Sequence, residues 1–173
     1  MIMSPAVRKL ALTAHVTASV GWLGAVAAFL ALAVVGLTSQ DGQIVRAAYI
    51  AMDLTGWFVI VPLSFASLLT GLVEALGTKW GLFRHYWVLA KLLINIFANI
   101  VLLMYMPTLS YLAGEATETR LSTADLGGLR DPSPVLHSTA ALLLLLVATV
   151  LGVYKPRGMT KYGWRKQHER LAV

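Results

Sequence analysis

The stretch LALTAHVTASVGWLGAVAAFLALAVVGLTSQ, residues 10–40, contains no Asp, Glu, Lys or Arg. A helix needs about 20 apolar residues to cross a hydrocarbon core of about 30 Å, so this run can span a membrane. Further runs without these charged residues follow at 54–73, 92–114 and 132–154. Inside lipid the backbone must satisfy its own hydrogen bonds, which favours helices. The sequence therefore predicts an all-α chain with four transmembrane helices.

The overall composition supports a membrane protein. Of the 173 residues, 58% are hydrophobic and only 13% are charged, whereas soluble domains carry about 25% charged residues. There is no cysteine, which excludes disulfides and thiolate metal sites. Arg8 and Lys9 precede the first apolar run as in a signal peptide, but that run exceeds the 7–15 residues of a signal sequence. We therefore expect it to be a retained helix.

Proline, glycine and polar residues divide the chain into one integral membrane domain, residues 1–173. The expected helices cover about 5–37, 47–76, 84–106 and 134–155, followed by a basic tail at 156–173. Pro107 is expected to end the third helix and to open an outer loop, 107–133, with a short surface helix near 115–122. Short connections between the first three helices favour an up-down bundle.

The net charge of +6 is unevenly placed along the chain. With four crossings, one side of the membrane receives most cations: Arg8, Lys9, Lys79, Arg84, Lys155, Arg157, Lys161, Arg165, Lys166 and Arg170. Lysine and arginine favour cytoplasmic loops, so both termini are predicted to be cytoplasmic. The tail also carries Tyr154, Tyr162 and Trp164, which suits anionic lipid headgroups. This placement argues against a nucleic-acid partner.

Polar residues inside the predicted helices mark the candidate site, because they are costly in lipid. His15 lies about 9 Å inside the inner boundary at a rise of about 1.5 Å per residue, and Lys91 lies at a similar depth. Glu74 is nearer the inner surface, so an ion pair with Lys91 is one expectation. Asn95 and Asn99 continue the Lys91 stripe and are expected to hydrogen-bond between helices.

Haem b is the cofactor that this pattern favours, for electron transfer or haem handling. Histidine on a bundle helix is a common axial ligand, and the propionates need cations at the membrane edge. His15 is the expected ligand, Lys91 and Arg84 the propionate partners, and Trp22 and Trp87 the walls. His137 lies near the opposite surface and is an optional second ligand or a separate metal site.

Two other functions remain open at this stage. A copper- or ion-handling domain would use His137, Met104, Met106 and Asp53 on the outer side, because thioether and imidazole suit copper(I). A stabilising subunit of a larger membrane complex would use its polar residues only as contacts between helices. The sequence does not decide between these, or between a homo-oligomer and a larger complex.

Three segments carry a resemblance to known proteins: HVTASVGWLG (15–24), LLTGLVEALGTKWGLFRHYWVLAKLLIN (68–95) and VLHSTAALLLLLVATVLGVYKPRGMTKYG (135–163). The chain resembles a family of small four-helix membrane proteins of unassigned function, typical of actinobacteria. This resemblance implies a bacterial plasma membrane.

A more distant similarity is to copper-resistance D-like domains and to HemJ-type haem-associated proteins. It implies a haem-associated core at His15, Trp22, Trp87 and Lys91. The proline- and arginine-containing segment that follows the first helix in the HemJ type is replaced here by GLTSQDGQIVR, residues 36–46. Haem binding is therefore the expectation, and oxidase activity is not.

Overall fold

The computed structural model describes residues 3–78, 81–118 and 129–171. Within them lie the helices α1 (Pro5–Thr38), α2 (Gly42–Thr55), α3 (Val61–Gly77), α4 (Tyr86–Glu118), α6 (Ser133–Tyr154) and α7 (Lys161–Leu171), and a π-helical segment, η1 (Gly56–Ile60), joins α2 to α3. Four continuous rods are long and apolar enough to cross a membrane: α1, α2–η1–α3, α4 and α6. The predicted all-helical chain with four long apolar helices is confirmed.

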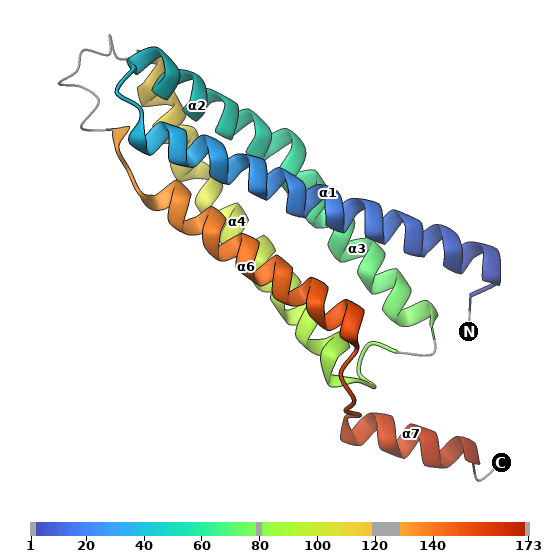
Figure 1. Cartoon of the computed structure of the whole chain (residues 1–173). Helices are drawn as coiled ribbons and strands as arrows, with labels where there is room; N and C mark the ends of the chain where they lie inside the picture. The colour runs from blue at the N-terminus through green and yellow to red at the C-terminus, as the bar shows by residue number, and fades with distance from the viewer. Residues whose placement is uncertain (1–2, 79–80, 119–128, 172–173) are drawn as a thin grey trace.

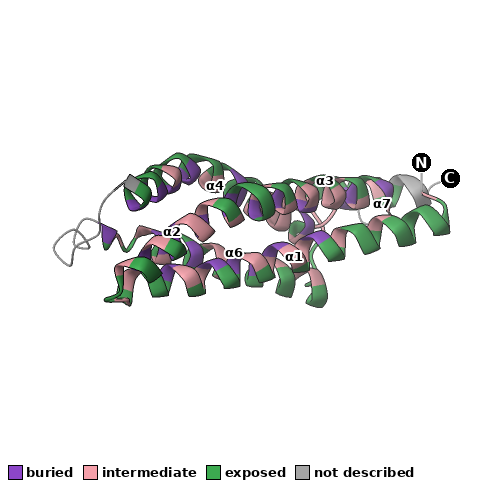
Figure 2. Cartoon of the chain, turned by 90° about the horizontal axis from the view of Figure 1, so that it is seen from above, coloured by how far each residue is buried: buried purple, intermediate pink, exposed green. Residues whose placement is uncertain are grey.

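The four rods form an elongated bundle (Figure 1). Helix α1 packs against α2, α3 and α6, and α4 packs against the same three elements, so α1 and α4 lie diagonally across the bundle. Both chain termini lie at one end of the molecule, which we call the inner end. Buried residues follow the facing sides of the rods (Figure 2). The apolar core contains Trp22, Val26, Phe29, Met52, Ile60, Met106 and Leu109.

A change of helical pitch divides the second rod. The π-helical turn Gly56–Ile60 is followed by Pro62, which lacks an N–H for the regular hydrogen-bond pattern. Gly56 is buried, and a Cβ added there would lie 2.8 Å from the Met106 methyl carbon. The glycine therefore lets α4 approach at this turn.

Pro107 does not end the third rod, contrary to the sequence-based expectation. Helix α4 continues from Tyr86 through Pro107 to Glu118, so the first part of the expected loop 107–133 is helical. Prolines are tolerated in membrane helices because neighbouring groups compensate for the lost hydrogen bond. Beyond the proline, Leu109 and Ala116 are fully buried in the core, and this burial favours continued helix. The rest of the surface helix expected near 115–122 extends into 119–128, outside the described residues.

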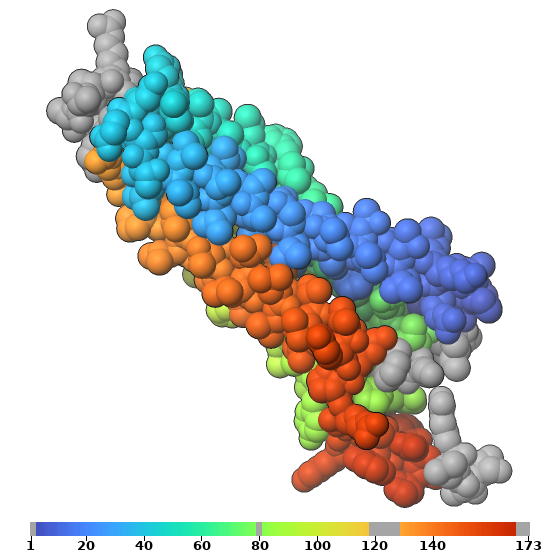
Figure 3. Space-filling model, in the orientation of Figure 1, coloured from blue at the N-terminus to red at the C-terminus, as the bar shows by residue number. Residues whose placement is uncertain are grey.

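The ends of the other rods are set by local caps. Helix α2 begins at Gly42, five residues earlier than expected, because the Asp41 carboxylate accepts a hydrogen bond from the Gln43 N–H at 2.8 Å. Helix α6 begins at Ser133, whose N–H donates to the Asp131 carboxylate at 2.7 Å. The basic tail contains a helix, α7, that the sequence did not predict. It lies beside the inner end of the bundle (Figure 3).

Candidate functional site

Polar side chains from three helices meet in the inner half of the bundle. We call them the inner polar cluster: His15 and Ser19 of α1, Ser64, Ser67, Thr70 and Glu74 of α3, and Lys91, Asn95 and Asn99 of α4. Ser64, Ser67 and Asn99 are almost fully buried. Buried polar groups in a membrane need partners, so the hydrogen bonds decide which side chains remain available for a ligand.

His15 is held against α3 by a threonine and a glycine. Its Nδ1 lies 3.1 Å from Thr70 Oγ1, and that hydroxyl donates its proton to the Ala66 carbonyl at 2.6 Å. A proton donated to Ala66 leaves the Thr70 oxygen free to accept from Nδ1–H of His15, and in that tautomer the lone pair is on Nε2. A Cβ added to Gly71 would lie 2.9 Å from His15 Cε1. The imidazole can pack here because residue 71 has no side chain.

Ser67 connects the three helices. Its hydroxyl lies 2.8 Å from the Ser19 hydroxyl of α1 and accepts from the Asn95 amide of α4 at 3.5 Å. The Ser67 carbonyl lies beside the His15 ring and accepts from Thr70 at 3.3 Å. One serine of α3 therefore couples the helix that carries His15 to the helix that carries Lys91.

The deepest part of the cluster is closed by hydrogen bonds within the protein. Ser64 lies 2.8 Å from both the Val61 carbonyl and Asn99 Oδ1. The Asn99 amide donates to the Asn95 carbonyl at 2.9 Å and to its side-chain oxygen at 3.1 Å. Among the described residues, no buried side-chain nitrogen or oxygen lacks a partner. Ser64 and Asn99 therefore act as contacts between helices and leave nothing for a ligand.

Lys91 crosses toward α6. A Cβ added to Gly152 would lie 3.0 Å from Lys91 Nζ, so the ammonium group lies against the last turn of α6. Its charge interacts with those of Glu74 and Lys155, and also with His15. The Glu74–Lys91 ion pair stays a prediction, supported by their mutual electrostatic interaction.

The predicted aromatic walls, Trp22 and Trp87, and the second cation, Arg84, have contacts outside the inner polar cluster. Trp22 is 2% exposed and belongs to the apolar core. Trp87 has its ring 6.4 Å from that of His85, centroid to centroid, at the start of α4. The Arg84 carbonyl accepts from the Thr160 N–H at 3.0 Å, which places this residue at the contact with the tail.

His137 is far from His15 along the bundle. Its ring stacks on Tyr105 with centroids 4.0 Å apart, and its Nδ1 lies 2.8 Å from the Ser133 carbonyl of its own helix. His137 lies one turn from the start of α6, whereas Lys91 contacts Gly152 near its end. The 15 residues from His137 to Gly152 rise about 22 Å. The two histidines are therefore not positioned to share one haem.

The outer copper set is not brought together either. Met104 is 74% exposed and Met106 is 1% exposed, so they lie on opposite faces of α4. Asp53 accepts a hydrogen bond from Ser110 at 2.7 Å, and Ser110 accepts from the Trp57 indole at 3.0 Å. Within the described residues, no group of three or more His, Cys, Asp or Glu side chains is placed to hold a metal ion.

Thr70 and Gly152 were not singled out by the sequence. Thr70 is an ordinary helix residue by its spacing, and its role appears only once α1 packs on α3. Gly152 is one of 14 glycines in the chain, and its contact with Lys91 depends on the packing of α4 on α6. The position of Thr70, three residues after Ser67 on the polar side of α3, was the one available signal.

Comparisons of this chain with protein-family models, with curated proteins and with solved structures find no match.

Proposed function

We propose that the chain is a multi-pass membrane protein that binds haem b at the inner end of its bundle, with His15 as the single axial ligand. The observation that carries this proposal is the hydrogen bond between His15 Nδ1 and Thr70. When Nδ1 donates to Thr70 the lone pair is on Nε2, and metal-bound histidines commonly donate their other ring N–H to an oxygen acceptor in this way. The distant similarity to HemJ-type proteins at His15 and Lys91 supports the same ligand.

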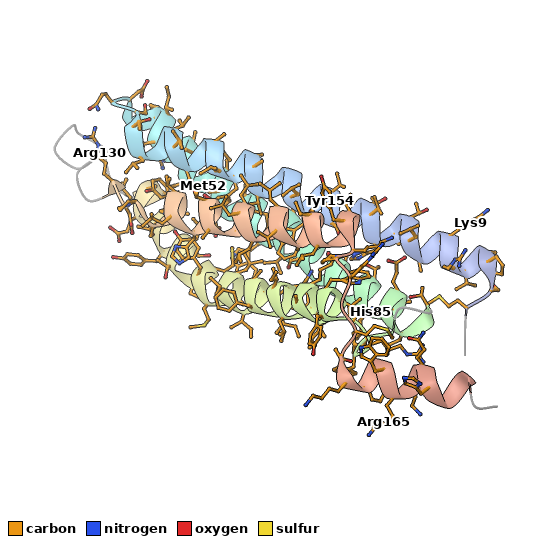
Figure 4. All side chains as sticks on the ribbon, turned by 60° about the horizontal axis from the view of Figure 1, so that its bottom comes forward. Lys9, Met52, His85, Arg130, Tyr154 and Arg165 are labelled. Atoms are coloured by element: carbon orange, nitrogen blue, oxygen red, sulfur yellow. The ribbon has the colours of Figure 1, made fainter. Side chains whose placement is uncertain are left out.

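Helices α1 and α6 bury fewer residues in the inner third of the bundle than in the rest, which suits a bound group better. No residue of α1 before Ala18 is buried, and none of α6 after Leu145 is buried. The first turns of α1 also extend beyond the end of α6 (Figures 1 and 4). His15 and Gly71 lie in this less filled part, whereas Trp22 lies in the packed core.

Lys91 is proposed as the propionate partner because it is the lysine of the inner polar cluster and its ammonium lies against Gly152 near the inner end of α6. Arg84 is the second proposed propionate partner, and its side chain lies beside Gly81 in the inner connection between α3 and α4. Bound haem would supply one-electron chemistry or be carried as cargo. The chain would supply the axial imidazole through His15 and charge compensation through Lys91.

The orientation in the membrane follows from charge. We place the bundle in a bacterial plasma membrane as an up-down bundle with both termini in the cytoplasm. The inner end carries Arg8 and Lys9 and most cations of the tail, and such residues concentrate on the cytoplasmic side. Anionic lipid headgroups are the proposed partners of that tail.

A second candidate function is a stabilising subunit of a larger membrane complex. It is favoured by the absence of unpartnered buried polar atoms among the residues described here. In that case Ser67, Asn95 and Asn99 hold the helices together, and His15 is a further contact of the same kind. The copper alternative has no comparable support, because Met104 and Met106 face opposite ways.

An optical spectrum separates these functions. Wild-type protein, expressed with added haem and purified in detergent, is expected to show a Soret band that His15→Ala abolishes. His137→Ala is the matched control and is expected to retain the band, because His137 lies toward the other end of α6. A colourless wild-type sample would refute haem binding. A band that survives His15→Ala in helical, monodisperse protein would refute the ligand.

A further inference from the structure

The tail is fastened to the start of α4 by backbone contacts. The Thr160 N–H donates to the Arg84 carbonyl at 3.0 Å, and the Tyr86 N–H donates to the Gly158 carbonyl at 3.4 Å. Gly163 is buried, and a Cβ added there would lie 2.4 Å from the Arg84 oxygen. We call this contact of residues 158–163 with 83–86 the tail clamp. Residue 163 has to be glycine for the two backbones to approach this closely.

The tail clamp acts on the first turn of the helix that carries Lys91. The N–H groups of a first helical turn have no partner inside the helix. Gly158 supplies one for Tyr86, the first residue of α4. Lys91 follows five residues later, about 7.5 Å along the helix. An ordered clamp therefore fixes the end of α4 from which Lys91 enters the bundle.

The side of α7 opposite Gly163 is exposed and cationic. Lys161, Arg165 and His168 recur at spacings of four and three, which places them on one helical face. Trp164 is 55% exposed beside them. Figure 4 shows Arg165 on the side of α7 that points away from the bundle, whereas His85 lies where bundle and tail meet.

The chemistry of this face matches an anionic membrane surface. Interfacial helices combine lysine and arginine with tryptophan, and each cation near such a surface adds to the attraction. The Trp164 ring lies 6.2 Å from that of His168, and Arg165 lies 5.9 Å from the centre of the Tyr162 ring. These contacts keep aromatic and cationic groups together on the outward side. An acidic protein surface would match the charge but would not require the aromatic groups.

We propose that anionic lipid headgroups, bound by this face of α7, hold the tail clamp closed and so order the start of α4 that carries Lys91. The inference rests on the proposed function only in identifying the inner polar cluster as the site that is regulated. The clamp and its lipid dependence can be measured without haem.

Hydrogen exchange in lipid nanodiscs tests the proposal directly. Haem-free protein is reconstituted in phosphatidylcholine alone or in phosphatidylcholine mixed with phosphatidylglycerol. Backbone amides of residues 84–89 are expected to exchange more slowly in the anionic discs. In the double variant Lys161→Glu and Arg165→Glu, the protection of residues 84–89 against exchange should fall by about fivefold for each cation removed. Gly163→Val breaks the clamp but keeps both cations. It should also lose the lipid-dependent protection of residues 84–89.

Lys9→Glu is the matched control, because Lys9 is an exposed cation of the inner end outside the clamp. It should retain the lipid-dependent protection. Equal protection in neutral and anionic discs would refute the role of lipid charge. Protection of α7 without protection of residues 84–89 would refute the coupling through the clamp. Because no haem is present, either result leaves the Soret experiment to decide the proposed function separately.

Discussion

Gly71→Ala tests the packing of His15 on α3, and its effect on the free energy of unfolding is expected to be less favourable with histidine than with alanine at position 15. The added Cβ would lie 2.9 Å from His15 Cε1 and 3.4 Å from Nδ1. Carbon atoms in good contact are about 3.5–4.0 Å apart, so the ring has to retreat by roughly 0.6 Å or more. The bond to Thr70, now 3.1 Å, would then lie near or beyond about 3.5 Å and be weakened or lost.

Two opposing terms set the size of the effect. Losing a hydrogen bond between membrane helices costs about 0.6 kcal/mol on average and up to about 1.7 kcal/mol. Replacing glycine by alanine within a helix stabilises it by roughly 0.5–1 kcal/mol. Gly71→Ala should therefore lie between about 0.4 kcal/mol stabilising and about 1.2 kcal/mol destabilising in the wild type. In a His15→Ala background the first term vanishes, and the substitution should stabilise by roughly 0.5–1 kcal/mol.

The assay is equilibrium unfolding of haem-free protein in mixed micelles, with a denaturing detergent as titrant, for the four variants of the double-mutant cycle. Gly24→Ala is the matched control, because a Cβ there meets nothing within 4 Å. It should stabilise by the same amount whether residue 15 is histidine or alanine. If Gly71→Ala shifts the free energy of unfolding equally in both backgrounds, the proposed contact between Gly71 and His15 is wrong.

Three further stability measurements probe the rest of the bundle. Met106→Ala should lower the free energy of unfolding by about 2–5 kcal/mol, because Met106 is 1% exposed. Met104 is 74% exposed, so Met104→Ala should change it by no more than about 0.5 kcal/mol. Equal losses would contradict the opposite placement of the two methionines. Asn99→Ala should cost more than Ser64→Ala, because it removes the contact with Ser64 and also both hydrogen bonds from the Asn99 amide to Asn95. A double-mutant cycle should give a coupling near 0.6 kcal/mol. Tyr49→Phe removes the hydrogen bond from the buried phenol to the backbone before α6 and should cost about 1 kcal/mol; an unchanged midpoint of unfolding would exclude that bond.

The helices were largely predictable because their cause is local. A run without charges, such as 10–40, is costly to expose to water and must form internal hydrogen bonds in lipid, whatever its neighbours are. Helix α1, Pro5–Thr38, accordingly ends within one residue of the prediction. The predicted end of the third helix was wrong, because Pro107 was judged by its local effect alone. Burial of Leu109 and Ala116 beyond the proline favours continued helix.

The candidate site was predicted in part. Helical spacing places Lys91, Asn95 and Asn99 on one side of α4, and the structure joins Asn95 and Asn99 by a hydrogen bond. Spacing does not say which partner each side chain meets. Trp22 is 2% exposed in the core, and its expected role as a wall of a cofactor slot stays a prediction.

For this protein the sequence by itself determined the helical class, the four apolar rods and the residue types that line their polar sides, because these depend on hydrogen bonding and transfer energy along one segment. Only the tertiary structure decided that His15 faces Thr70, that Lys91 reaches Gly152 and that the tail is clamped on Arg84. Each of these contacts joins segments more than 50 residues apart. Each also has a glycine at the contact: side chains lie against Gly71 and Gly152, and a backbone carbonyl lies against Gly163, and these approaches exist only once the helices have packed.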